Sequence, residues 1–172
     1  MITYKKKFDH KKTYFEQHKI KNKIPTIFIH GVGLDNTMWF PQKKNFLNNS
    51  TIFYDILNHG KSKKGFTKLH FKNFVSQLED LITFIGVKKI NLVGFSIGAL
   101  IAQHYTESNY DKVNKLVLIA SVYKRSKTQI EIIKKRFKNV SKGKSITIDS
   151  INRWFSTSYL KKNPNVFNFF FD

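Results

Sequence analysis

Residues 91–100 constrain the fold of this chain more than any other stretch. An apolar run enters the pattern Gly-x-Ser-x-Gly and leaves it as a helical sequence. In this strand–turn–helix setting a serine is held on a sharp, strained turn with its hydroxyl pointing out of the sheet. Gly94 and Gly98 are needed because strand and helix approach so closely that a Cβ at either position would clash. Ser96 is therefore the candidate nucleophile.

The rest of the sequence alternates strand patterns with helix patterns. Residues 25–29 form a continuous apolar run, which is typical of a strand buried on both faces. Between residues 69 and 85 the apolar positions recur at helical spacing, and Gly86 suits the helix C-cap. This alternation predicts an α/β fold with a doubly wound, mostly parallel sheet. The expected strands are 2–7 and 12–18 (a hairpin), 25–29, 51–55, 89–95 and 113–120; the expected helices are 37–47, 69–85, 97–107, 126–140 and 149–160.

The pattern changes after residue 120, because basic amphipathic helices follow and no strand signal returns. We therefore expect a core over residues 1–122 and a separate helical part over residues 123–172. The sequence stops in an apolar stretch, residues 165–172, without a closing element. Residues 113–120 would then form an exposed apolar sheet edge, which is an aggregation hazard.

Composition narrows the function classes. The net charge is +20, but all except three of the 31 basic residues are Lys, spread along the chain without a nucleic-acid-binding motif. We expect no nucleic-acid partner. No apolar run has the length of a membrane span, and residues 1–7 lack the apolar stretch of a signal peptide, so we expect a cytoplasmic protein without a membrane partner. The absence of Cys excludes disulfides, a thiol nucleophile and a Cys-ligated metal.

A serine nucleophile needs a base and preformed hydrogen-bond donors for the oxyanion that develops. One expected donor is the backbone N–H of Ile97, at the start of the helix. The second is the backbone N–H of Val32, in the glycine-rich turn of residues 30–35, where Gly31 lets the backbone approach. Trp39 lies soon after this turn and is a candidate for the acyl pocket or, equally, for the core.

At these motifs the chain resembles the α/β-hydrolase family, and within it most closely the 3-oxoadipate enol-lactonases and related carboxylic-ester hydrolases. The resemblance implies a sheet of the α/β-hydrolase type with residues 123–172 as part of a helical cap. It also implies hydrolysis of a small-molecule ester or lactone, without a metal or organic cofactor. The similar segments are HGVGLDNTMWFPQ (30–42), YDILNHGKS (54–62), GFSIGALIAQ (94–103), KLVLIASVYKRS (115–126) and RWFSTSYLKKNP (153–164).

The resemblance also implies a catalytic triad that runs Ser, acid, His along the chain. The only histidine after Ser96 is His104, about 12 Å along the same helix and facing away, so it cannot be the base. Either the sequence is a fragment cut within the cap, or it is a degenerate non-catalytic relative. We expect a fragment without triad turnover, because the elbow and the oxyanion turn are intact. The alternatives are a C–C bond hydrolase or perhydrolase on the same fold, and a non-catalytic binding protein.

Other polar and aromatic residues allow a functional and a structural interpretation. His30 is a stand-in base or, as we prefer, a brace for the oxyanion turn. Asp55 and His59 form an acid–base pair or, as we prefer, a structural loop beside the pocket. In the cap, Arg153 is a hypothetical contact for a substrate carboxylate. The candidate substrate contacts are Gly31, Trp39 and Trp154, the last of which could equally belong to an apolar seam.

Overall fold

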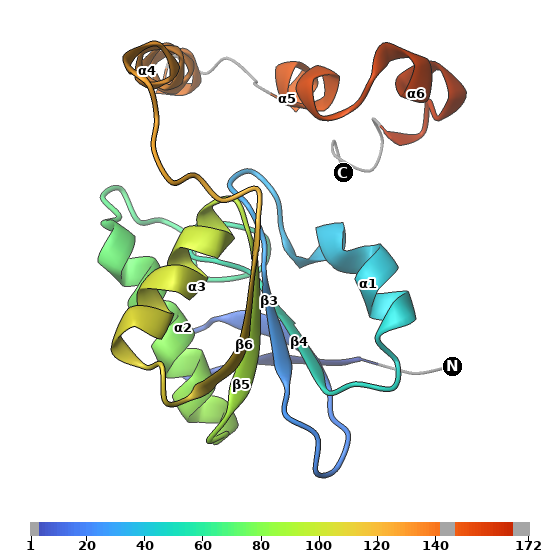
Figure 1. Cartoon of the computed structure of the whole chain (residues 1–172), viewed down its shortest axis with the longest axis vertical. Coiled ribbons are helices and arrows are strands. Elements are labelled where there is room, and N and C mark those ends of the chain that lie inside the picture. The colour runs from blue at the N-terminus through green and yellow to red at the C-terminus, as the bar shows by residue number, and fades with distance from the viewer. Residues whose placement is uncertain (1–3, 142–146, 167–172) are drawn as a thin grey trace. The chain divides into compact units, whose positions relative to one another are not determined.

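The structure, a computed structural model, describes residues 4–141 and 147–166, and the chain divides into two units, Met1–Val122 and Tyr123–Asp172. The first unit contains a six-stranded sheet with helices on both faces, whereas helices and loops make up the described residues of the second (Figure 1). Most of the apolar end noted at residues 165–172 lies outside the described residues.

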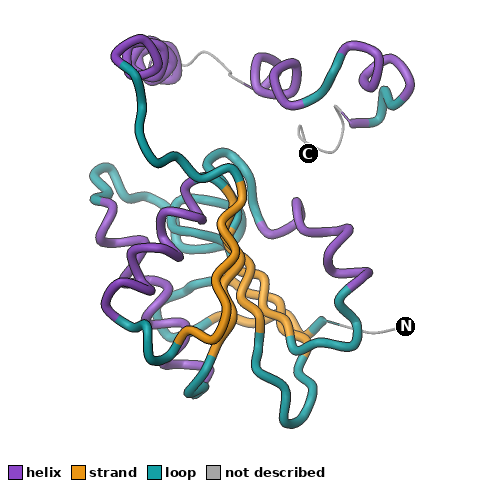
Figure 2. Tube along the Cα trace, in the orientation of Figure 1, coloured by secondary structure: helices purple, strands orange, loops and turns teal. Residues whose placement is uncertain are grey.

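The sheet is mixed and mostly parallel, as the sequence predicts; its strands are the orange segments in Figure 2. Its strand order is β1-β2-β4-β3-β5-β6, in which the predicted hairpin adds two antiparallel strands at one edge and the four remaining strands run parallel. The strands are β1 (Lys5–Phe8), β2 (Tyr14–His18), β3 (Thr26–Ile29), β4 (Thr51–Tyr54), β5 (Ile90–Phe95) and β6 (Val113–Ile119).

Helices cover the two faces of the sheet. The long helices α2 (Phe71–Ile85) and α3 (Ile97–Ser108) lie on one face, and the short α1 (Phe40–Asn45) lies on the other (Figure 1). The prediction of one helix over residues 37–47 is wrong, because a 3₁₀ turn, η1 (Asn36–Trp39), precedes α1. Pro41 explains the break: it has no N–H to continue the hydrogen-bond ladder, and it favours the first turn of a new helix.

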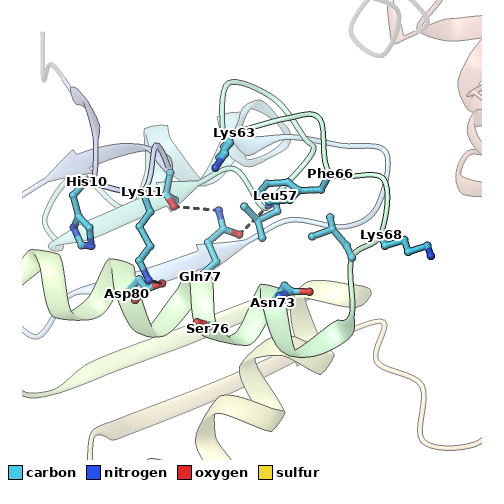
Figure 3. A pocket seen from close by; sticks show the side chains of 12 residues that line it. His10, Lys11, Leu57, Lys63, Phe66, Lys68, Asn73, Ser76, Gln77 and Asp80 are labelled. Atoms are coloured by element: carbon cyan, nitrogen blue, oxygen red, sulfur yellow. Dashed lines mark hydrogen bonds and ion pairs between the residues drawn. The ribbon is translucent and has the colours of Figure 1, made fainter.

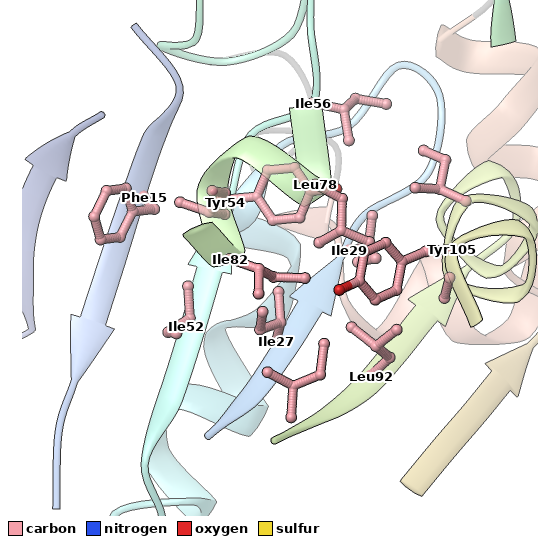
Figure 4. Close-up of a cluster of buried hydrophobic side chains, with 14 residues drawn as sticks. Phe15, Ile27, Ile29, Ile52, Tyr54, Ile56, Leu78, Ile82, Leu92 and Tyr105 are labelled. Carbon is pink, nitrogen blue, oxygen red and sulfur yellow. The ribbon is translucent and has the colours of Figure 1, made fainter. Parts of the chain in front are cut away.

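The core has two parts, because successive side chains of a strand point to opposite faces. Ile27 and Ile29 of β3 belong to the larger cluster, under α2 and α3 (Figure 4). Phe28 lies on the other face, where its ring stacks on Phe53 at 4.5 Å and lies 5.2 Å from Trp39. Trp39 therefore has the packing role that the sequence left open, and its contact with a substrate stays a prediction.

The second unit contains α4 (Lys127–Ser141), α5 (Thr147–Trp154) and α6 (Thr157–Lys162). The predicted helix over residues 149–160 is in fact divided between α5 and α6. Ser156 causes the division, because its backbone is extended and its Oγ accepts a hydrogen bond from the Tyr159 N–H at 3.2 Å as the N-cap of α6. Among the described helices, none combines the length and the apolar character that a membrane span requires.

Candidate active site

Ser96 occupies a strained turn between β5 and α3. Its backbone has φ 55° and ψ −114°, in the positive-φ region that residues with a side chain rarely adopt. Hydrogen bonds on both sides hold it there. The Ser96 N–H donates to the Ile119 carbonyl of β6 at 3.0 Å, and its carbonyl accepts from the N–H of Ala99 at 3.1 Å and of Leu100 at 3.3 Å. The strained strand–turn–helix geometry predicted from the sequence is confirmed.

The two glycines of the elbow are required by close backbone packing. A Cβ built on Gly98 would overlap the carbonyl oxygens of Ile29 and His30, at the end of β3. A Cβ built on Gly94 would overlap the backbone of Gly98 and Ala99. The start of α3 thus rests directly on the ends of two strands, as expected. This contact fixes the backbone position of Ser96, which lies between the two glycines.

The turn after β3 lies beside Ser96. A Cβ built on Gly31 would be 2.9 Å from Cδ1 of Phe95 and 3.4 Å from Cβ of Ser96, so only glycine lets the two turns approach this closely. Val32 follows and is 57% exposed. Neither the N–H of Val32 nor that of Ile97 donates a hydrogen bond to another residue that the structure describes. Their role as oxyanion donors stays a prediction.

His30 braces this turn from within the core. Its side chain is fully buried; its Nδ1 donates to the Gly31 carbonyl at 2.8 Å, and its Nε2 accepts from the Ile56 N–H at 3.0 Å. These contacts need the neutral imidazole with its proton on Nδ1. Burial lowers the pKa of His30 from 6.5 to about 4. With both nitrogens engaged, the contacts favour the brace over the stand-in base.

Acid should weaken the first unit through His30. Between pH 6.5 and about 4 the unfolded chain binds a proton at His30 that the folded imidazole does not bind. The stability that neutral His30 contributes is therefore fully present above pH 6.5 and is lost as the pH falls toward about 4. We expect His30 to account for a loss of about 2 kcal/mol in unfolding free energy between pH 7 and pH 5. Urea unfolding of the wild type and of His30→Gln at both pH values measures it. An equal pH dependence in the two proteins would contradict this assignment.

Asp55 organises two loops and does not orient a histidine. Its carboxylate is buried; Oδ1 accepts from the backbone and side-chain N–H groups of Asn36 at 2.8 and 2.7 Å, and Oδ2 accepts from the Lys61 N–H at 2.8 Å. Burial raises the pKa of Asp55, against the effect of these donors. The His59 Nδ1 instead lies 2.8 Å from the Leu57 carbonyl. The contacts favour the structural loop over the acid–base pair.

Sequence reasoning missed Asn36 and Gln77, which complete the Asp55 network. The Gln77 Nε2 donates to the Asp55 carbonyl at 3.0 Å, and its Oε1 accepts from the Leu57 N–H at 2.9 Å. A signal existed for Gln77, because it is a polar residue beside the apolar stripe of its helix; the structure shows that it is almost fully buried. Asn36 had no such signal, since its partner is 19 residues away.

The remaining candidates lie within helices α3 and α5. The His104 ring is 5.7 Å from Phe71 of α2, at the contact between α2 and α3. In the second unit, Trp154 ends α5 and is 40% exposed, and the Arg153 Nη2 is 3.4 Å from the Ser150 Oγ. Their roles toward a substrate stay predictions.

Residues 25–161 match the alpha/beta hydrolase fold family. Among curated proteins, the chain is similar to the (E)-2-((N-methylformamido)methylene)succinate hydrolase of Acinetobacter baylyi, with 29% identity over 150 residues. The aligned region covers 87% of this chain and 56% of that protein. Among solved structures, a hydrolase from Pseudomonas aeruginosa superposes with a TM-score of 0.81 at 16% identity, covering 92% of this chain and 60% of that one. The enol-lactonase of Burkholderia xenovorans gives 0.78 at 17% identity, with 92% and 62% covered. The chain thus spans less than two thirds of each of these proteins.

Proposed function

The chain belongs to the α/β-hydrolase fold family, and from that premise we propose that the whole protein hydrolyses a carboxylic ester or lactone of a small molecule, with Ser96 as the nucleophile. The proposal concerns the whole protein, because this chain spans 56% of the length of the curated hydrolase it matches. In it, residues 1–122 supply the nucleophile and the oxyanion donors, and residues 123–172 form part of a cap.

The backbone strain at Ser96 carries the proposal. A serine at φ 55° costs free energy, and such strain is characteristic of functional sites whose surroundings hold the residue in place. Here the surroundings are the Ile119 carbonyl, the packed Gly98 and the adjacent turn at Gly31. A serine that merely connected a strand to a helix would not need this combination.

The chemistry follows from the groups around Ser96. Its Oγ attacks the carbonyl carbon of the substrate, and the carbonyl oxygen becomes an oxyanion. The N–H groups of Val32 and Ile97 donate to that oxyanion, and the N-terminal dipole of α3 favours its negative charge. Collapse of this intermediate expels the alcohol and leaves an acyl-serine, which water then hydrolyses. A base must take the Ser96 proton and return it to the alcohol.

The base and the acid that orients it come, in our proposal, from residues beyond this sequence. The His30 nitrogens are both engaged in the core, and His104 lies against Phe71. The choice of an ester or lactone substrate is supported by the names of structural neighbours, which include an enol-lactonase and a marine microorganism esterase. The enol-lactonase-like specificity rests on that resemblance.

A thiol at position 96 tests the nucleophile site without the missing base, because a thiolate forms by ionisation alone. The chain has no Cys, so Ser96→Cys creates a unique thiol. We expect p-nitrophenyl acetate to acylate it in one burst of p-nitrophenolate without turnover. The rate constant per thiolate should exceed that of an ordinary exposed thiol by about 10-fold or more, since each oxyanion donor contributes about 10²–10³ in a complete site.

The matched control is Ser108→Cys, an exposed position at the opposite end of the same helix. Thiol pKa values measured for both variants correct the rates for the thiolate fraction. Equal rate constants per thiolate would contradict the assignment of the oxyanion donors, and with it the proposed function. Mass spectrometry of the acylated chains identifies the modified residue.

A further inference from the structure

One side of α2 presents a polar stripe to a pocket. Asn73, Ser76, Gln77 and Asp80 recur at the spacing that places residues on one face of a helix. They line an open pocket of about 440 Å³, which is bordered by the turn between β1 and β2 and by the loop after β4 (Figure 3). This volume lies within the range of small-molecule sites.

The pocket carries an excess of positive charge. Lys11, Lys63 and Lys68 line it, and Asp80 is the one carboxylate among its lining residues. Asp80 is paired with the Lys11 Nζ at 2.7 Å. Lys63 has its Nζ 5.2 Å from the centre of the Phe66 ring, and neither Lys63 nor Lys68 forms an ion pair within the described part of the chain. Lys63 and Lys68 are thus free to pair with an anionic ligand, although the exposed Lys68 side chain points outward in Figure 3 and must rotate to do so.

One wall of the pocket is apolar, and hydrogen bonds hold it in place. Leu57 and Phe66 contribute this wall, between Lys63 and Lys68 in Figure 3. The Gln77 Oε1 accepts a hydrogen bond from the backbone N–H of Leu57, and the Gln77 Nε2 donates to the Asp55 carbonyl and the Thr13 hydroxyl. Gln77 therefore ties the helix, the loop and the hairpin turn together, and the pocket does not need a ligand to form.

We propose that this pocket binds a small organic dianion with an apolar part. Lys63 and Lys68 contact the negative charges, Asn73 and Ser76 supply neutral hydrogen-bond donors, and Leu57 and Phe66 contact the apolar part. None of these residues belongs to the Ser96 site, so the pocket is a second site and does not depend on the proposed hydrolysis. The two charges can sit on one phosphate ester or on two carboxylates.

Titration of the ¹⁵N-labelled full chain, followed by NMR, tests the proposal with four probes. Phenyl phosphate and phthalate distinguish the two kinds of dianion, inorganic phosphate lacks the apolar part, and benzyl alcohol lacks the charge. We expect saturable shifts at the backbone amides of Leu57, Phe66 and Asn73 for at least one aromatic dianion. Its binding should be tighter than that of inorganic phosphate or benzyl alcohol, since both halves of the pocket contribute.

Charge variants separate the pocket from the general basic surface. We expect Lys63→Ala and Lys68→Ala each to weaken binding by about 3- to 5-fold at low salt, as for single partly exposed ion pairs. Lys21→Ala removes the same charge at an exposed position outside the pocket and should have no effect. Equal weakening by all three variants, shifts that do not saturate, or benzyl alcohol binding as tightly as the dianions would each overturn the proposal.

Discussion

Gly98→Ala is expected to destabilise the first unit by about 3 kcal/mol or more, or to prevent its folding. The added Cβ would meet the carbonyl oxygens of Ile29 and His30. These atoms belong to the backbone at the end of β3, so no side-chain rotation can relieve the overlap. Urea unfolding followed by circular dichroism measures the loss, and the yield of soluble protein replaces it if the variant does not fold.

A glycine that is needed for its backbone angle alone provides the control. Gly86 ends α2 with φ 70°, and a Cβ built there has no atom within 4 Å. Gly86→Ala should therefore cost only about 1 kcal/mol, the penalty of a left-handed alanine. If Gly98→Ala costs no more than Gly86→Ala, the close contact between α3 and β3 is not what requires the elbow glycine.

Asp55→Ala is expected to lower the free energy of unfolding by about 3–5 kcal/mol. The substitution removes the acceptor of three N–H groups, two from Asn36 and one from Lys61, in a place that is closed to water. Asp55→Asn should retain part of the stability, since its amide oxygen can still accept from Asn36. Its NH₂ group would face the Lys61 N–H, so one donor remains without a partner.

Asp35→Ala serves as the matched loss of a carboxylate. Asp35 is the N-cap of η1, and its exposed carboxylate accepts from the Thr37 N–H at 2.8 Å. Loss of such a cap costs about 1 kcal/mol. Hydrogen exchange at the Asn36 and Lys61 amides should accelerate in Asp55→Ala and remain slow at Lys61 in Asp35→Ala. Equal destabilisation by the two variants would refute the organising role of Asp55.

The elbow could be predicted because its requirements are local. Gly94, Ser96 and Gly98 lie within five consecutive residues, and the apolar run before them and the helical pattern after them are both visible in the sequence. The parallel sheet was predictable for a related reason, since alternating strand and helix patterns leave few topologies. The preference for a brace role of His30 followed from the family resemblance, which places the base at the far end of the chain, although the partner Ile56, 26 residues away, could not be predicted.

The contacts that position the loops have no periodic signature. Asp55 meets Asn36 across 19 residues, and Gln77 meets Thr13 across 64. Such bonds join a side chain to a partner that only the folded topology brings near. The helix boundaries failed for a different reason: Pro41 and Ser156 are ordinary local signals, but the helical pattern of the apolar residues continues through both. Local capping chemistry prevailed over that pattern.

The bond from the Ser96 N–H to the Ile119 carbonyl also sets an order of events during synthesis. Ser96 leaves the ribosome before β6 exists, and the parallel pairing of β5 with β6 cannot begin until Val113 and the residues after it have emerged. Until then nothing on that side compensates the strain of the turn. A nascent chain that pauses before β6 therefore lacks one of the contacts that hold Ser96 in its turn, and it gains that contact only when the last strand of the first unit is in place.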